Sequence, residues 1–138
     1  MNILKVLTER RETGNLGEHA AAIFLKKNGY KILKRNYEAV DYEIDIIAEN
    51  KTTTVFVEVK TRTVGHQSPK EPRPASSVTP DKQRKIITAA KYFLGTHRVG
   101  KRVRFDIIEV YLDENKKVQN IMHLESAFNY NTAHPSRG

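Results

Sequence analysis

Two short segments of the chain, residues 42–49 and 54–61, alternate apolar and polar side chains, and they constrain the fold more than any other feature. An alternation with a period of two is typical of a β-strand that buries one face. The segment between them, residues 50–53, is short enough to close a hairpin. We therefore expect an antiparallel pair of strands whose apolar faces coincide.

The apolar faces fix the expected register of this hairpin. Matching them gives three pairs, Ile44–Val59, Ile46–Val57 and Ala48–Val55. The same register sets Asp45 opposite Glu58 and Glu43 opposite Lys60. A register two residues tighter would set Glu43 against Glu58, and like charges directly across a sheet repel. We therefore predict the first register, with the Cβ atoms of Asp45 and Glu58 about 5 Å apart.

A close pair of carboxylates predicts a particular chemistry. The two groups repel unless a proton or a cation lies between them, and hard divalent cations such as Mg²⁺ prefer carboxylate oxygens as ligands. Lys60 lies two residues after Glu58 and is expected on the same face of its strand. The hairpin therefore predicts a site for Mg²⁺ or Mn²⁺ with an ammonium group beside it.

Composition sets the broad class of the protein. A chain of 138 residues with 38% hydrophobic and 29% charged residues suits a single globular domain. No apolar run reaches the roughly 20 residues that a membrane span requires, and the N-terminal segment is charged too early for a signal peptide. The absence of cysteine excludes disulfides and thiol catalysis. We expect a cytoplasmic protein that does not engage membranes.

The remaining elements follow from periodicity and from helix and turn signals. Residues 1–13 lack a clear period and are expected to be frayed or to start a short helix. Asn131 to Gly138 is expected to be disordered, and residues 63–79, which contain three prolines, to form a long mobile loop. The expected helices cover 16–28 and 80–94, and the further strands cover 30–37, 102–112 and 117–124.

The order of these elements, α-β-β-β-α-β-β, predicts an α/β domain with a mixed central sheet. One domain is expected over residues 1–138, with its core at about residues 15–124. The long loop leaves the charged strand directly after Arg62, so it is a candidate flap over a substrate.

The net charge of +8 favours polyanionic partners, of which nucleic acid is the leading candidate. Five basic residues are the expected nucleic-acid contacts: Arg35, Arg62, Lys82, Arg84 and Lys85. A solvated basic surface without a ligand is the alternative that charge alone leaves open.

Several motifs together resemble a known family. Glu18 on the first helix, Asp45, and the triplet Glu58-Val59-Lys60 resemble the PD-(D/E)xK nuclease superfamily, which has a restriction-endonuclease-like core. More narrowly, four segments are similar to the YraN family, a relative of archaeal Holliday-junction resolvases: residues 17–21, 43–48, 55–62 and 104–106. Tyr42 departs from the pattern, because this family usually has glycine there.

The resemblance implies roles for these residues. Asp45, Glu58, the carbonyl of Val59 and Glu18 would hold Mg²⁺ or Mn²⁺, and Lys60 would orient or deprotonate the attacking water or neutralise developing charge. Structural alternatives remain open for Glu18, which follows Asn15 as in a capping box, and for Glu58 and Lys60 on a solvated face. We expect Arg104 and Asp106 to pair structurally, and the five histidines to lie on the surface or in loops.

Three functions are consistent with these patterns. The first is a metal-dependent endonuclease that hydrolyses phosphodiester bonds in DNA, in a branched or otherwise structured form. The second is a non-catalytic module that binds nucleic acid and retains the nuclease fold. The third is a protein-interaction scaffold. A homodimer is expected for a small nuclease that must cut two strands.

Overall fold

The computed structural model describes residues 2–64, 78–97 and 100–136 of the chain. Much of the expected mobile loop therefore lies outside the described residues. The helices and strands, in chain order, are α1 (Ile3–Lys27), β1 (Lys31–Ala39), β2 (Tyr42–Glu49), β3 (Thr53–Thr63), α2 (Pro80–Thr96), β4 (Arg102–Leu112), β5 (Val118–Phe128) and α3 (Tyr130–Ala133).

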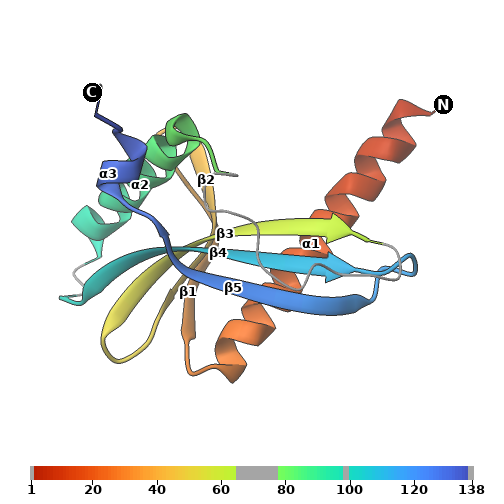
Figure 1. Ribbon diagram of the computed structural model, residues 1–138, viewed down its shortest axis with the longest axis horizontal. Coiled ribbons are helices and arrows are strands. Elements are labelled where there is room, and N and C mark those ends of the chain that lie inside the picture. Colours follow the sequence, from red (N-terminus) through yellow and green to blue (C-terminus); the bar gives the residue numbers. More distant parts are fainter. Residues whose placement is uncertain (1, 65–77, 98–99, 137–138) are drawn as a thin grey trace.

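The five strands form one mixed sheet in the order β1-β2-β3-β4-β5. Strands β3 and β4 are parallel, and the other neighbours are antiparallel. A parallel pair needs a crossover connection, which here contains α2. In Figure 1, α2 and α3 lie together at one end of the sheet, and the first half of α1 extends beyond it. The expected mixed α/β fold is confirmed.

Helices cover both faces of the sheet. The second half of α1 packs Ala21, Ala22 and Leu25 against one face, where Val55 and Val57 are buried. Helix α2 packs against the other face and contributes five residues to the hydrophobic cluster there: Ile86, Ile87, Ala89, Ala90 and Phe93. Burial on both faces explains the continuous apolar runs at residues 46–48 of β2 and 55–57 of β3. A charged side chain within these strands must therefore have a specific partner.

The β2–β3 register is confirmed in part. Ile46 pairs with Val57 and Ala48 with Val55, as expected. The ladder between these described strands runs only from the Ile46–Val57 pair to the Glu49–Thr54 pair. The expected ladder pairs Ile44–Val59, Asp45–Glu58 and Glu43–Lys60 are therefore wrong. The strands diverge there, and Asp45 contacts β3 through its side chain.

The expected face of Ile44 is also wrong. Ile46 belongs to the cluster under α1, whereas Ile44 is buried in the cluster under α2, with Ile47 and Phe56. Because Ile44 and Ile46 are two residues apart, a regular strand would place them on one face. Strand β2 therefore rotates about its axis at Asp45, between them.

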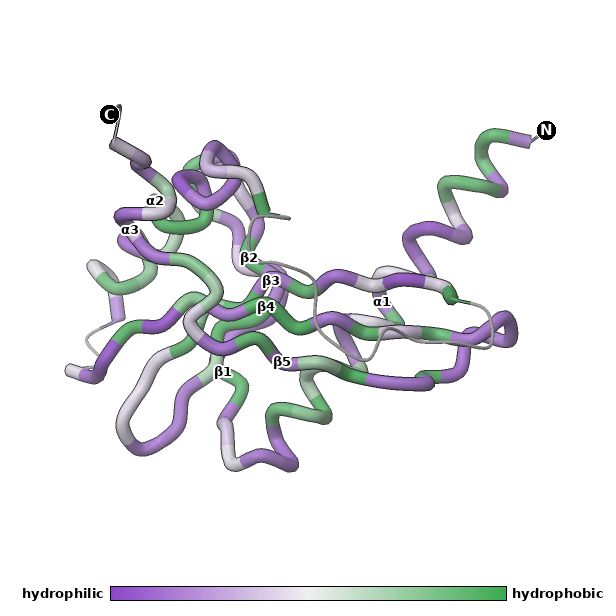
Figure 2. The backbone as a smooth tube through the Cα atoms, viewed as in Figure 1, coloured by the Kyte–Doolittle hydropathy of each residue, from purple (hydrophilic) through white to green (hydrophobic). Residues whose placement is uncertain are grey.

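Helix α1 begins much earlier than expected. It starts after Asn2, whose side chain accepts a hydrogen bond from the backbone N–H of Lys5, and it runs for 25 residues. The side chains of Ile3, Leu4 and Leu7 on its first turns are 69%, 74% and 53% exposed. Figure 2 shows apolar residues at this projecting end of the helix. Of the two alternatives expected for residues 1–13, the helical start holds for the described residues 3–13 and fraying does not, although the helix is long and not short.

Helix α2 has the expected start. The Thr79 hydroxyl accepts a hydrogen bond from the N–H of Lys82, and Pro80 occupies the first turn. The C-terminal end differs from expectation, because α3 forms inside the segment expected to be disordered. An Asn129–Thr132 capping box begins α3, and Ala133 is fully buried. Disorder is therefore wrong for residues 131–134, whereas residues 137–138 lie outside the described part.

Candidate metal and nucleic-acid site

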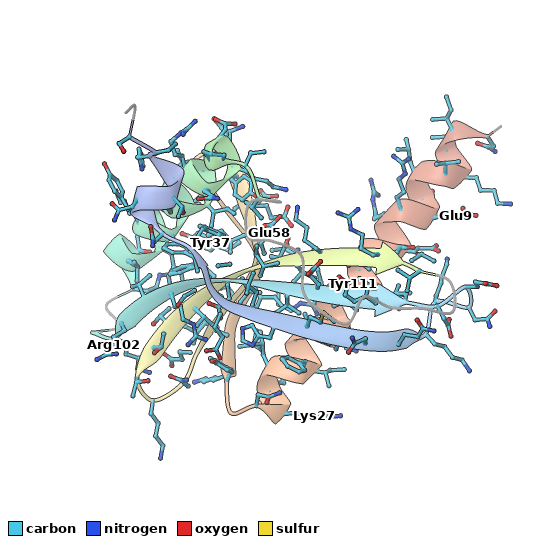
Figure 3. The ribbon with its side chains drawn as sticks, viewed as in Figure 1. Glu9, Lys27, Tyr37, Glu58, Arg102 and Tyr111 are labelled. Carbon is cyan, nitrogen blue, oxygen red and sulfur yellow. The ribbon has the colours of Figure 1, made fainter. Side chains whose placement is uncertain are left out.

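A cleft of about 660 Å³ opens where β2 and β3 diverge. Figure 3 labels Glu58 between α2 and the projecting part of α1, which carries Glu9. The charged residues that line the cleft come from four elements, α1, β2, β3 and α2: Glu9, Arg10, Glu18, Asp45, Glu58, Lys60 and Lys82. The structure thus brings together the four predicted catalytic residues and adds the cations Arg10 and Lys82 and a further acid, Glu9.

Asp45 is held against the backbone of β3. Its Oδ2 accepts a hydrogen bond of 2.8 Å from the N–H of Val59, which replaces a ladder contact at the point where the strands separate. Burial, followed by repulsion from Glu58 and Glu18, raises the pKa of Asp45 to about 8, although the Val59 hydrogen bond opposes this. The site therefore disfavours the ionised form of Asp45 when no cation is present.

Glu58 is the most enclosed acid of the cleft, with only 8% of its side chain exposed. Its Oε1 lies 3.1 Å from the Nζ of Lys82 and 3.7 Å from the Nζ of Lys60. Its Oε2 accepts a hydrogen bond of 3.3 Å from the hydroxyl of Tyr42, whose own pKa is raised by burial and by Glu58. Tyr42, at the start of β2, is therefore a hydrogen-bond donor to Glu58.

The two lysines of the cleft differ electrostatically. Burial lowers the pKa of Lys60, and the positive charges of Lys82 and Arg62 lower it further, against the attraction of Glu58. Burial acts on Lys82 in the same direction, but Glu58 overcomes it and raises the pKa of Lys82. Lys60 is thus the ammonium group better suited to release a proton, and Lys82 is the firmer positive charge.

Asn36 positions Glu18, and sequence reasoning missed it. The Nδ2 of Asn36 donates hydrogen bonds of 2.9 Å to Glu18 on α1 and 2.8 Å to Glu43 on β2. Its φ of 52° lies in the left-handed region, which asparagine tolerates better than most residues. An asparagine in the middle of a strand is disfavoured, so its presence was the available signal. Glu43 therefore bonds to Asn36, and it does not face Lys60 as expected.

The residues present fit a divalent cation chemically. Asp45 and Glu58 are oxygen donors in a partly buried cleft, where Glu58 disfavours the charge of Asp45, and a cation between them would relieve that repulsion. Within residues 2–64, 78–97 and 100–136, however, no three histidine, aspartate or glutamate side chains are already grouped to hold a metal. Binding would therefore require side chains to rearrange, first of all the lysines on Glu58.

The five basic residues predicted to contact nucleic acid have different environments. Lys82 lies inside the cleft. Arg62 is exposed near the end of β3, Arg35 is exposed on β1, and Lys85 is exposed 3.4 Å from Asp81. The guanidinium of Arg84 instead donates a hydrogen bond of 2.8 Å to the carbonyl of Ala133. Arg84 therefore holds α3 against α2, a structural role that the sequence did not indicate.

A second polar network lies away from the cleft, on β4 and β5. The fully buried Asp106 accepts hydrogen bonds from Arg104 and from the N–H of Ser126, and lies 2.7 Å from Nε2 of His123. Arg104 also donates to the hydroxyl of Tyr30. The expected structural pairing of Arg104 with Asp106 is confirmed. The expected surface position is wrong for His123, whose side chain is only 11% exposed.

No helix in the described part of the chain is long and apolar enough to cross a bilayer.

Sequence comparison identifies relatives along most of the chain. The profile of "Uncharacterised protein family UPF0102" matches residues 17–110, which include three acids of the cleft, Glu18, Asp45 and Glu58. A UPF0102 protein of Desulfosudis oleivorans is 45% identical over 130 residues, covering 93% of this chain and 98% of the relative. Another, from Caldicellulosiruptor saccharolyticus, is 42% identical and covers 86% of this chain and 98% of the relative. A third, from Chloroherpeton thalassium, is 40% identical over 83% of this chain and 92% of its own length.

Proposed function

The chain belongs to family UPF0102, the family also called YraN, and from the chemistry of its cleft we propose that it is a metal-dependent endonuclease. The substrate would be DNA in a branched or otherwise structured form, and the reaction would be hydrolysis of a phosphodiester bond. We assign the fold to the PD-(D/E)xK superfamily as part of the same proposal. The observation that carries it is the convergence of Asp45, Glu58 and Lys60 on one cleft.

The electrostatics of the chain support this proposal. Four acids lie beside three cations in one cleft of a protein whose net charge is +8. The positive charge attracts a polyanion, while the acids repel it unless a cation neutralises them. This combination suits an enzyme that binds nucleic acid and a divalent cation together. In a protein that binds nucleic acid alone, acids in the binding cleft would only weaken the binding.

Each residue of the cleft has a defined task in this mechanism. Asp45, Glu58 and the carbonyl of Val59 would hold Mg²⁺ or Mn²⁺, with Glu18 as a further carboxylate that Asn36 positions. The bound ion supplies charge neutralisation at the phosphate and lowers the pKa of water. Lys60, whose pKa is lowered, would take a proton at Nζ from the attacking water or donate a hydrogen bond to a phosphate oxygen.

Cleavage assays on a panel of DNA structures test the proposal. Purified protein is incubated with Mn²⁺ and with flap, four-way junction, single-stranded and duplex substrates. We expect cleavage of at least one branched substrate, a loss of at least 100-fold in Asp45→Ala and Lys60→Ala, and full activity in Glu114→Gln, which changes an exposed turn residue. Absence of cleavage of every substrate, or equal cleavage by Asp45→Ala, would refute the enzymatic function.

One observation favours a second function, a non-catalytic module that binds nucleic acid. Both oxygens of Glu58 already have partners within the protein, namely Lys82, Lys60 and Tyr42. A site that satisfies its own acids can be stable without a cation. Binding of DNA that weakens with salt, equally in the wild type and in Asp45→Ala and without any cleavage, would support this module over the enzyme.

A further inference from the structure

Lys82 places a positive charge beside Glu58, one of the two carboxylates proposed to hold the cation. The carboxylate is almost fully removed from solvent, with 8% of its side chain exposed, and a buried charge of this kind requires a partner. Lys82 provides the shorter of its two ion pairs, at 3.1 Å against 3.7 Å for Lys60. Lys82 is therefore the main counter-ion of Glu58 when no metal is bound.

Lys82 and Lys60 both lie near Oε1 of Glu58, and a divalent cation on that oxygen would be repelled by them. A divalent cation on Oε1 of Glu58 would lie within a few ångströms of the Lys82 ammonium, and repulsion at that distance is strong in a partly buried site. Either Lys82 leaves Glu58 or the cation does not bind there. Cation binding and the Lys82–Glu58 ion pair are thus in competition.

Lys82 is free to make that move. Its backbone is fixed in the first turn of α2, because its N–H bonds to the hydroxyl of Thr79. Its side chain, however, is 38% exposed, compared with 21% for Lys60, and lysine has a long flexible stem. The ammonium group can therefore swing into the open part of the cleft while the helix stays in place.

We propose that Lys82 is an internal surrogate for the metal: it neutralises Glu58 in the cation-free protein and transfers to a phosphate of the nucleic acid when a divalent cation displaces it. This inference rests on the proposed function. It adds Lys82 to the residues expected to contact phosphate. It also explains why substrate binding would depend on the metal, because the cation releases Lys82 from Glu58. The Lys82 side chain would then never be without an anionic partner.

Calorimetric titration with Mn²⁺ tests the competition. We expect Lys82→Gln to bind Mn²⁺ about three- to fivefold more tightly than the wild type, because the ion pair between the partly exposed Lys82 and Glu58 no longer has to be broken. Lys82→Arg keeps the positive charge and should bind Mn²⁺ like the wild type. Lys91→Gln, on the same helix with its ammonium over the ring of Tyr130, makes the same change of net charge elsewhere and should also leave the affinity unchanged.

A binding experiment tests the transfer to phosphate. The probe is a duplex with phosphorothioate linkages, which resist hydrolysis, in a constant concentration of Mn²⁺. The slope of log affinity against log salt should be about 0.9 shallower for Lys82→Gln than for the wild type, corresponding to one lost phosphate contact. The slope of Lys91→Gln should equal that of the wild type.

The outcomes separate this inference from the function beneath it. If the wild type binds no Mn²⁺, or Asp45→Asn binds it equally well, the metal site and the inference both fail. If Mn²⁺ binding depends on Asp45 but Lys82→Gln binds it no more tightly than the wild type, the metal site stands and the Lys82 inference is overturned. An unchanged salt slope in Lys82→Gln would overturn the transfer to phosphate. Thermal unfolding of each variant confirms that it is folded.

Discussion

Asp45 lies where the folded state disfavours its charge. Burial, together with repulsion from Glu58 and Glu18, raises its pKa from 3.8 to about 8. Between about pH 4 and about pH 8, the native protein therefore keeps a proton that the unfolded chain has released. Since the unfolded state binds fewer protons in this window, the free energy of unfolding of the cation-free protein falls as the pH rises through it.

Replacing Asp45 with asparagine should remove this pH dependence. The asparagine oxygen can still accept the hydrogen bond from Val59, so the loss of the charge is the main change. We expect Asp45→Asn to be about 1–3 kcal/mol more stable than the wild type at pH 8 in EDTA, and nearly equal to it at pH 4. Urea unfolding at the two pH values measures this. A difference that is the same at both, or that also occurs in the exposed Glu114→Gln, would contradict the explanation.

Asp106 shows the opposite electrostatic balance. Burial favours its protonated form, but hydrogen bonds from His123, Arg104 and the N–H of Ser126 outweigh burial and lower its pKa. Its contribution to stability is present above the unfolded pKa and is lost as the pH falls through the folded one. We expect Asp106→Asn to lose about 2–4 kcal/mol in urea unfolding at pH 7, and less at pH 3, below the unfolded pKa.

A matched variant separates this network from ordinary surface charge. Glu125 lies 3.7 Å from the same arginine, Arg104, but 58% of its side chain is exposed. Glu125→Gln should therefore change the free energy of unfolding by less than about 0.5 kcal/mol. If Glu125→Gln costs as much as Asp106→Asn, the buried hydrogen bonds are not the source of the stability.

At the level of elements, periodicity correctly predicted the helices and strands that bury one face against the core. Strand β4 has the expected bounds, and α2 begins at the expected cap, because both present apolar side chains at regular spacing to a core. The same reasoning failed for the first half of α1, whose apolar residues are exposed and so are not subject to that pattern. It failed at Ile44 because β2 rotates locally where the side chain of Asp45 bonds to β3. The apolar–polar alternation of the sequence gives no sign of this rotation. The acids of the site were predictable, whereas their partners Asn36, Tyr42 and Lys82 depend on tertiary contacts.

The contact between α1 and β3 depends on Gly17. This residue is buried, and a Cβ added to it would overlap the side chain of Thr61, whose own Cβ would be 2.8 Å away. Gly17→Ala should therefore push α1 off the sheet, displace Glu18 and destabilise the protein by about 1–3 kcal/mol in urea unfolding. Gly14→Ala, on the same helix with nothing within 4 Å, should instead stabilise by about 0.5–1 kcal/mol.

A second substitution tests whether Thr61 is the cause. Combining Gly17→Ala with Thr61→Ala removes the hydroxyl and methyl groups that the new Cβ would overlap. We expect the double variant to recover part of the lost stability, so that the two changes are not additive. Strict additivity would show that the helix, and not its contact with β3, is sensitive to alanine at this position.

For the whole molecule, we expect the projecting start of α1 to lie outside the unit that folds cooperatively. Its side chains Ile3, Leu4 and Leu7 are largely exposed and bury little apolar area. Removing residues 2–8 should therefore change the free energy of unfolding by less than about 1 kcal/mol, because stability follows burial. Urea unfolding of the truncated chain measures this. A loss of more than about 2 kcal/mol, or a broader transition, would show that these residues are covered in solution.

The charge distribution of the whole chain predicts cooperative binding of its two proposed ligands. A net charge of +8 attracts DNA, and a divalent cation held by Asp45 and Glu58 would add positive charge in the cleft, where the acids otherwise offset Arg10, Lys60 and Lys82. By linkage, the factor by which Mn²⁺ strengthens DNA binding must equal the factor by which DNA strengthens Mn²⁺ binding. We expect a factor of about 10 in each direction, measured with a phosphorothioate duplex by fluorescence anisotropy and by calorimetry.

In Asp45→Asn the factor should fall to about 1, while the salt-dependent binding that follows from net charge persists. Equal factors in the two proteins would mean that Mn²⁺ acts on the DNA and not in the cleft.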